Sequence, residues 1–179
     1  MMSYDEAFLA SDELVGLRYF TLDDVEAVTA ACQDSDISRW TTIPSPYTAA
    51  HATGFINLQE GWRGDGSAFH FAIVDRSSGR LSGSIGLGSI KLPPTQVGYW
   101  VAPWARRRRL ATHALRLVTT WAFEDLHLDT ISLVTKIGNE PSERVARNAG
   151  YVFSDEVRDY GPENSSDRFA VRRWVQANA

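Results

Sequence analysis

Residues 97–115 read VGYWVAPWARRRRLATHAL, and this stretch decides the fold class. Its first six residues, VGYWVA, alternate small, aromatic and β-branched side chains and indicate a strand that Pro103 ends. From Leu110 onward, apolar residues at helical spacing form one stripe, which predicts a long amphipathic helix. That helix is expected to begin inside the run of four arginines that precedes Leu110.

The segments around this stretch predict the order strand, two helices, three strands, helix, strand, helix and two strands. The predicted strands cover residues 14–20, 69–74, 81–90, 97–102, 130–135, 151–160 and 168–175. Helices are expected after Thr21 and Thr48, from the arginine run to Ala122, and from Pro141 to Gly150, and residues 37–47 are expected to form an ordered loop. Adjacent strands followed by strand–helix alternation predict an α/β (α+β) fold, in which helices cover a central mixed sheet.

Length and composition favour a single domain over residues 1–179, with residues 1–12 as a loosely ordered lead-in. Hydrophobic residues make up 44% and charged residues 22%, which is ordinary globular usage and excludes global disorder. Cys32 is the one cysteine, so the chain is not a disulfide scaffold. No apolar run is long enough to span a bilayer, and no signal peptide is evident, so a cytoplasmic protein without a membrane partner is expected.

The arginine run is the most unusual feature of the sequence. A helix N-terminus carries about half a positive charge and free N–H groups, so cations there are unfavourable unless an anion binds. Free N–H groups beside guanidinium groups form an anion site, for which phosphate is the obvious occupant. A solvated arginine patch is the alternative in this arginine-rich chain. The net charge of −4 argues against a nucleic-acid partner.

Three segments resemble the GNAT acetyltransferases, and most closely their ribosomal-protein N-terminal acetyltransferase branch. Residues 97–115 are similar to the acetyl-CoA-binding motif. Asn139, Ser142 and the later Gly150–Tyr151 pair resemble the second motif, and the segment ISRWTTIPSPY at residues 37–47 resembles the same branch. The resemblance covers about residues 14–175. It implies the GNAT fold, with a mixed, mostly antiparallel sheet of about seven strands and helices on both faces.

The resemblance implies an enzyme that moves the acetyl group of acetyl-CoA to a primary amine by direct attack, without a metal. In the family, the strand backbone at Trp100 and Val101 pairs with the pantetheine arm of the cofactor. Asn139 helps to hold the cofactor, and Ser142 is the candidate proton donor to the departing thiolate, so these two are the expected catalytic residues. The loop that wraps the pyrophosphate corresponds to Arg106, Arg107, Arg108, Arg109, Leu110, Ala111 and Thr112.

The acceptor is expected to be a protein N-terminus or a small amine, and the sequence does not choose between them. Trp40 and Tyr47 belong to the loop that borders the acceptor site in relatives, with core packing as the alternative. His70 points away from its apolar neighbours and is a candidate base at the substrate site, with a structural role as the alternative. No metal-ligand spacing and no Gly-x-Ser-x-Gly elbow is present. A homodimer is left open.

The sequence departs from the family pattern at positions that matter for chemistry. Arg107 and Arg109 stand where the family has glycines, which favour close backbone approach to phosphate. Gln96 replaces a glutamate that accepts a proton in many relatives, and the tyrosine acid of other branches falls at Ala146. Two alternatives follow: a degenerate GNAT domain that binds CoA or another ligand without catalysis, and a nucleic-acid or partner-binding module that uses the arginine patch.

Overall fold

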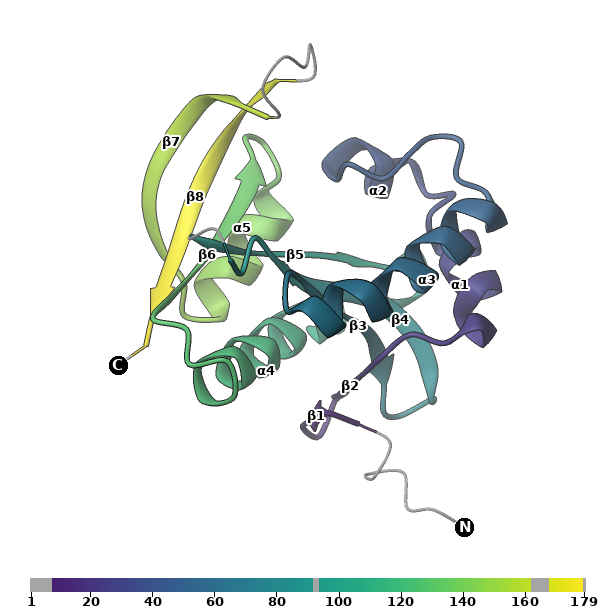
Figure 1. The fold of residues 1–179 in the computed structure, drawn as a ribbon. Coiled ribbons are helices and arrows are strands. Elements are labelled where there is room, and N and C mark those ends of the chain that lie inside the picture. Colours follow the sequence, from purple (N-terminus) through teal and green to yellow (C-terminus); the bar gives the residue numbers. More distant parts are fainter. Residues whose placement is uncertain (1–7, 92–93, 162–167, 179) are drawn as a thin grey trace.

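The computed structural model describes residues 8–91, 94–161 and 168–178. Within them, one sheet of eight strands forms the centre, in the order β1-β2-β3-β4-β5-β6-β8-β7 (Figure 1). All neighbouring strands are antiparallel except β5 and β6, which are parallel. This confirms the predicted mixed, mostly antiparallel sheet. The strands are β1 (Ala10–Ser11), β2 (Val15–Arg18), β3 (Phe69–Asp75), β4 (Arg80–Gly88), β5 (Thr95–Val101), β6 (Thr130–Lys136), β7 (Val152–Tyr160) and β8 (Phe169–Ala177).

Helices cover both faces of the sheet, as predicted (Figure 1). They are α1 (Val25–Ala31), α2 (Ser35–Trp40), α3 (Ala49–Asp65), α4 (Leu110–Glu124) and α5 (Glu140–Asn148). Alternation along β3 divides the core in two, because successive side chains of a strand point to opposite faces. Phe71 and Ile73 pack under α4, whereas Ala72 and Val74 pack with α1 and α3. Burial on both faces explains why Phe71 to Val74 are all apolar.

The structure differs most clearly from the sequence prediction at three places. The expected loop at residues 37–47 begins inside α2, because the Asp34 carboxylate accepts hydrogen bonds from two backbone N–H groups and starts a helix. Helix α4 begins at Leu110, after the arginine run, because Arg109 has a φ of 63° that a right-handed helix cannot accommodate. Ala10–Ser11 pair with β2, so the lead-in is structured there, and its residues 1–7 lie outside the described range.

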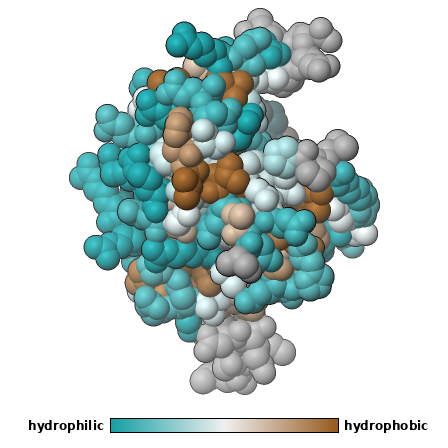
Figure 2. Space-filling model, turned by 90° about the vertical axis from the view of Figure 1, so that its left-hand side faces the viewer, coloured by the Kyte–Doolittle hydropathy of each residue, from teal (hydrophilic) through white to brown (hydrophobic). Residues whose placement is uncertain are grey.

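The side of the molecule that carries β7 and β8 is mostly hydrophilic, with a compact apolar patch near its centre (Figure 2). Strand β7 lies at the edge of the described sheet and exposes Val152 and Phe153. Among the described helices, none combines the length and the apolar character needed to cross a bilayer.

Candidate active site

Strands β5 and β6 separate at the centre of the sheet (Figure 1). They pair only through residues 95–97 and 131–133, although both strands continue beyond these residues. The rest of β5 pairs with β4 alone, so Trp100 and Val101 keep backbone groups unpaired on the side toward β6 within the described sheet. A Cβ atom placed on Gly98 would meet no atom within 4 Å, so the space over this segment is open. The divergence therefore leaves a free strand edge beside free volume.

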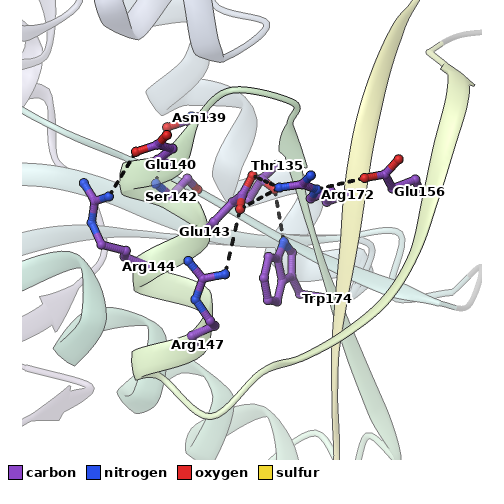
Figure 3. Close-up of polar contacts among 10 residues, drawn as sticks. All are labelled: Thr135, Asn139, Glu140, Ser142, Glu143, Arg144, Arg147, Glu156, Arg172 and Trp174. Carbon is purple, nitrogen blue, oxygen red and sulfur yellow. Dashed lines mark hydrogen bonds and ion pairs between the residues drawn. The ribbon is translucent and has the colours of Figure 1, made fainter.

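Ser142 joins the first turn of α5 to β5. Its Oγ lies 2.8 Å from the hydroxyl of Tyr99. Its backbone N–H donates to the side-chain oxygen of Asn139, which caps the helix, at 3.3 Å. Figure 3 shows Asn139 and Ser142 together on this turn. Burial raises the pKa of Tyr99 to about 12, so its phenol keeps its proton at neutral pH. The structure thus brings the two expected catalytic residues together and adds a hydroxyl from β5.

Sequence reasoning missed Tyr99, although a signal for it exists. Tyr99 follows Val97 by two residues, so both side chains face the same side of the sheet. That side is covered by α4 and α5, and Tyr99 packs against its core. A strand tyrosine that faces the helix bearing the Asn-x-x-Ser motif is therefore the pattern that predicts this contact.

A buried carboxylate fixes α5 against strand β8. Glu143 is only 4% exposed, and both of its oxygens accept from Nη1 of Arg172, at 2.9 and 3.0 Å. Arg172 also donates from Nε to Glu156 at 3.0 Å (Figure 3). Hydrogen bonds from Arg172 to Glu156 and Glu143 raise the pKa of this arginine, so the guanidinium stays charged. Because Glu143 follows Ser142 directly, this network also fixes where Ser142 lies. No sequence motif signalled it.

The loop before α4 adopts the backbone of a glycine-rich loop without its glycines. Arg107 and Arg109 have φ values of 61° and 63°, in the left-handed region that glycine favours. These are the two positions where the family resemblance expects glycine. In the described part of the chain, the backbone N–H groups of Arg109, Leu110 and Ala111 donate to no protein group. Free donors at the N-terminus of α4 form an anion-binding arrangement.

The four arginine side chains divide into two pairs. Arg106 contacts Asp34 at 2.5 Å and Asp36 at 3.4 Å, and Arg108 contacts Asp75 at 2.6 Å. Burial by itself would raise the pKa of Asp75, but the hydrogen bonds from Arg108 and two serines hold it well below its usual range. The side chains of Arg107 and Arg109 make no hydrogen bond or ion pair with a described residue. The expected phosphate cluster of four arginines therefore has two members engaged by protein carboxylates.

Replacing both left-handed arginines by glycine is expected to stabilise the fold. Arg107→Gly and Arg109→Gly each relieve backbone strain, for an expected gain of roughly 0.5–1 kcal/mol per position after the higher chain entropy of glycine is subtracted. Arg108→Gly is the matched control, because it removes an ion pair to Asp75 at a position without a positive φ, and it should destabilise. Denaturant unfolding measures both. A double-glycine variant less stable than wild type would contradict the argument.

The expected acceptor residues lie on the face covered by α1 to α3, and the structure does not gather them around Ser142. Tyr47 is 8% exposed and packs in the core of this face. The His70 ring lies against Gly86, between Phe55 and Trp62, with ring centroids at 5.4 and 5.5 Å. Burial lowers the pKa of His70 to about 4, so it is neutral at pH 7.

Trp40 differs from the other two acceptor candidates. It is half-buried at the end of α2, and a Cβ atom on Gly138 would lie 3.9 Å from its ring. Gly138 immediately precedes Asn139. Of the three predicted acceptor residues, Trp40 thus comes nearest to the first turn of α5.

The residues at or near the positions where relatives carry proton-transfer groups make other contacts in this structure. The side-chain amide of Gln96 donates to the hydroxyl of Tyr160 at 2.7 Å, which joins β5 to the β7–β8 hairpin. Asp155 pairs with Arg173 at 3.3 Å, and Glu156 pairs with Arg172. Ala146 is fully buried. No group of three or more His, Cys, Asp and Glu side chains that would hold a metal occurs in the described ranges.

The profile of the Acetyltransferase (GNAT) domain matches residues 15–152 of this chain. The chain belongs to the GNAT acetyltransferase family. This confirms the family that the strand, the arginine loop and the Asn-x-x-Ser turn indicate. The match spans β2 to the start of β7 and so includes the divergent strands, the loop before α4 and the first turn of α5.

Individual relatives fall in the expected branch. The chain is 31% identical over 83 residues to "Putative ribosomal N-acetyltransferase YdaF" of Bacillus subtilis (strain 168), which is 45% of either chain. It thus spans about half the length of the curated relative that it matches. The ribosomal-protein-S5-alanine acetyltransferase of Vibrio fischeri is 18% identical, with a TM-score of 0.81 over 95% of this chain and 97% of that chain. Mycobacterium smegmatis RimJ in complex with CoA-disulfide is 18% identical, with a TM-score of 0.79 over 91% and 81%. These two structures share the fold.

Proposed function

We propose that this protein is an acetyl-CoA-dependent N-acetyltransferase that acetylates a primary amine by direct attack. We also propose that residues 1–179 form a single domain. The observation that supports this proposal most strongly is the divergence of β5 from β6, with the Ser142–Tyr99 hydroxyl pair beside the free edge of β5. An extended acyl carrier can pair with such an edge and end at these hydroxyl groups.

The residues present fit acetyl-CoA. The backbone of Trp100 and Val101 is free on the side toward β6 to pair with the pantetheine amides. The N–H groups of residues 109–111 are free to receive the pyrophosphate at the N-terminus of α4. The side chains of Arg107 and Arg109, which have no partner among the described residues, add charge-assisted contacts to phosphate. That RimJ is described in complex with CoA-disulfide supports the same ligand class.

The chemistry requires positioning of the two substrates and proton transfer at the amine and at the sulfur. Acetyl-CoA supplies a thioester, whose carbonyl carbon accepts the amine nitrogen and whose sulfur departs. Ser142 gives the hydroxyl proton to the departing sulfur, so the C–S bond breaks without release of a free thiolate. Either hydroxyl of this pair can be the donor, and the proposed step uses the arrangement in which Tyr99, protonated because burial raises its pKa to about 12, donates to Ser142 Oγ and leaves the serine hydrogen free for the sulfur. The amine loses one proton to water before attack, because Gln96 is not a base, and the proton that the nitrogen loses after attack returns through water to Ser142.

For the acceptor, we favour the N-terminal amine of a protein over a free small amine. The Vibrio fischeri relative is named a ribosomal-protein-S5-alanine acetyltransferase, and the Bacillus subtilis relative is named a putative ribosomal N-acetyltransferase. Trp40, at the end of α2, lies beside Gly138, which directly precedes the Asn139 cap of α5. Tyr47 and His70 stay predictions for this role. A homodimer is also a prediction, for which the exposed apolar residues of edge strand β7 offer a surface.

Two observations weigh against the alternatives. The loop keeps a glycine-like backbone although arginines occupy it, which speaks for retained cofactor binding. Arg106 and Arg108 are paired with carboxylates, which halves the charge that the arginine run offers to nucleic acid.

Acetyl-CoA turnover across a panel of amines tests the proposal. The panel contains peptides with N-terminal alanine or serine, free amino acids and polyamines. Micromolar acetyl-CoA binding by calorimetry, with thiol release for at least one amine, supports the enzyme. Binding without turnover selects the degenerate domain. No binding at millimolar ligand, together with a salt-sensitive shift of DNA, selects the nucleic-acid module.

A further inference from the structure

Helix α2 is tied at both ends to segments of the cofactor side. At its N-terminal end, Arg106 Nη2 lies 2.5 Å from Asp34 Oδ1, and Arg106 Nη1 lies 3.4 Å from Asp36 Oδ2. At its C-terminal end, Lys136 Nζ donates to the carbonyl oxygens of Arg39 and Thr41, at 2.8 and 3.3 Å. Two cations from different elements therefore hold one short helix.

These two anchors come from opposite sides of the divergence between β5 and β6. Arg106 follows β5 and opens the loop whose next residues offer left-handed backbone and free N–H groups. Lys136 is the last residue of β6 and precedes the Asn139 cap of α5 by three residues. Helix α2 therefore bridges the loop before α4 and the turn before α5, and it places Trp40 beside Gly138.

The helix depends on these anchors for its order. It has six residues, far below the length at which an isolated helix is stable, and Ile37 is its one buried side chain. Asp34 caps it and is also the carboxylate that Arg106 contacts, with side chains 19% and 35% exposed. Burial raises the pKa of Asp34, but hydrogen bonds from Arg106 and the backbone lower it more, so the carboxylate stays ionised. The cap and the ion pair act through one side chain.

We propose that Arg106 is a positioning residue that couples the acetyl-CoA loop to the acceptor side through Asp34 and α2. The inference rests on the proposed function and reassigns Arg106, which sequence reasoning placed on phosphate. When the pyrophosphate binds the loop before α4, Arg106 is fixed in place and its ion pair with Asp34 fixes α2. Helix α2 in turn keeps Trp40 beside Gly138. Acetyl-CoA binding therefore favours acceptor binding.

The test compares Arg106→Gln with wild type by hydrogen–deuterium exchange and steady-state kinetics. In Arg106→Gln, exchange in residues 35–42 should speed up roughly 5- to 10-fold, the size expected from loss of a half-exposed charge-assisted pair. The acceptor KM should rise by about the same factor, with kcat and the acetyl-CoA Kd within about twofold. Adding acetyl-CoA should slow exchange of residues 35–42 in wild type and have no such effect in the variant.

Two further variants make the result specific. Asp34→Asn keeps a good helix cap but loses the charge, so it should match Arg106→Gln, and the double variant should be no worse than either single variant. Arg108→Gln, which loses its contact with Asp75 instead, should leave exchange in residues 35–42 unchanged.

Specific results overturn the proposal. An unchanged exchange rate of residues 35–42 in Arg106→Gln would contradict it. So would a tenfold weaker acetyl-CoA Kd with an unchanged acceptor KM, which would indicate that Arg106 contacts the phosphate instead. If wild type turns over no amine, the proposed function fails, while the exchange response to acetyl-CoA still decides the coupling.

Discussion

Replacing Ser142 by alanine is expected to lower kcat by roughly 10- to 1000-fold, which overlaps the lower part of the usual range of about 100- to 10,000-fold for general acid–base groups. Ser142 Oγ is held 2.8 Å from the Tyr99 hydroxyl beside the free edge of β5, where the thioester sulfur would lie. Without this hydroxyl, sulfur departs as an unprotonated thiolate. The loss should fall on kcat, while the acetyl-CoA Kd changes less than threefold or so, because the cofactor contacts are mostly elsewhere.

Two companion variants separate proton donation from structure. Tyr99→Phe keeps Ser142 but removes the hydrogen bond that orients it, so a smaller loss of roughly 3- to 10-fold is expected. Ser142→Thr retains a hydroxyl and should recover most of the activity that alanine loses. Stopped-flow or steady-state thiol release measures all three. An unchanged kcat in Ser142→Ala at saturating substrates would remove Ser142 from the mechanism.

The elements with local signals were predictable from the sequence. The apolar stripe of α4 predicted a buried helix face, and Leu110, Ala114, Val118 and Ala122 are each at most 2% exposed. Asn139 caps α5, and Gly150 takes a φ of 96° just beyond its end, as the capping patterns require. In these cases the hydrogen-bond partner or packing face lies within a few residues, so spacing alone determines it.

The contacts that the sequence did not reveal join residues far apart in the chain. Arg106 lies 72 residues from Asp34, and Tyr99 lies 43 residues from Ser142. No local pattern distinguishes an arginine that turns toward a carboxylate from one that turns toward phosphate, because both occupy the same loop with the same charge. The family resemblance supplied the backbone role of the loop, and only the tertiary structure divides its side chains.

The rate of acetyl transfer is expected to follow the protonation of the amine. At low amine concentration, kcat/KM should rise about tenfold per pH unit below the amine pKa and level off above it, because only the free base attacks. Tyr99 and His70 do not titrate in that range. Burial raises the pKa of Tyr99 to about 12 and lowers the pKa of His70 to about 4, and Gln96 has no proton equilibrium there.

Two acceptors with different amine pKa values make this decisive. A peptide N-terminus has a pKa near 7.7–8.0 and a lysine side chain near 10.4, so the bend in the profile should move by roughly 2.5 pH units between them. If the bend stays at one pH for both amines, a protein base controls the step. Asp155 and Glu156, which pair with Arg173 and Arg172, are then the first residues to replace, followed by His70. Replacing the responsible carboxylate by Asn or Gln would then restore the tenfold rise per pH unit.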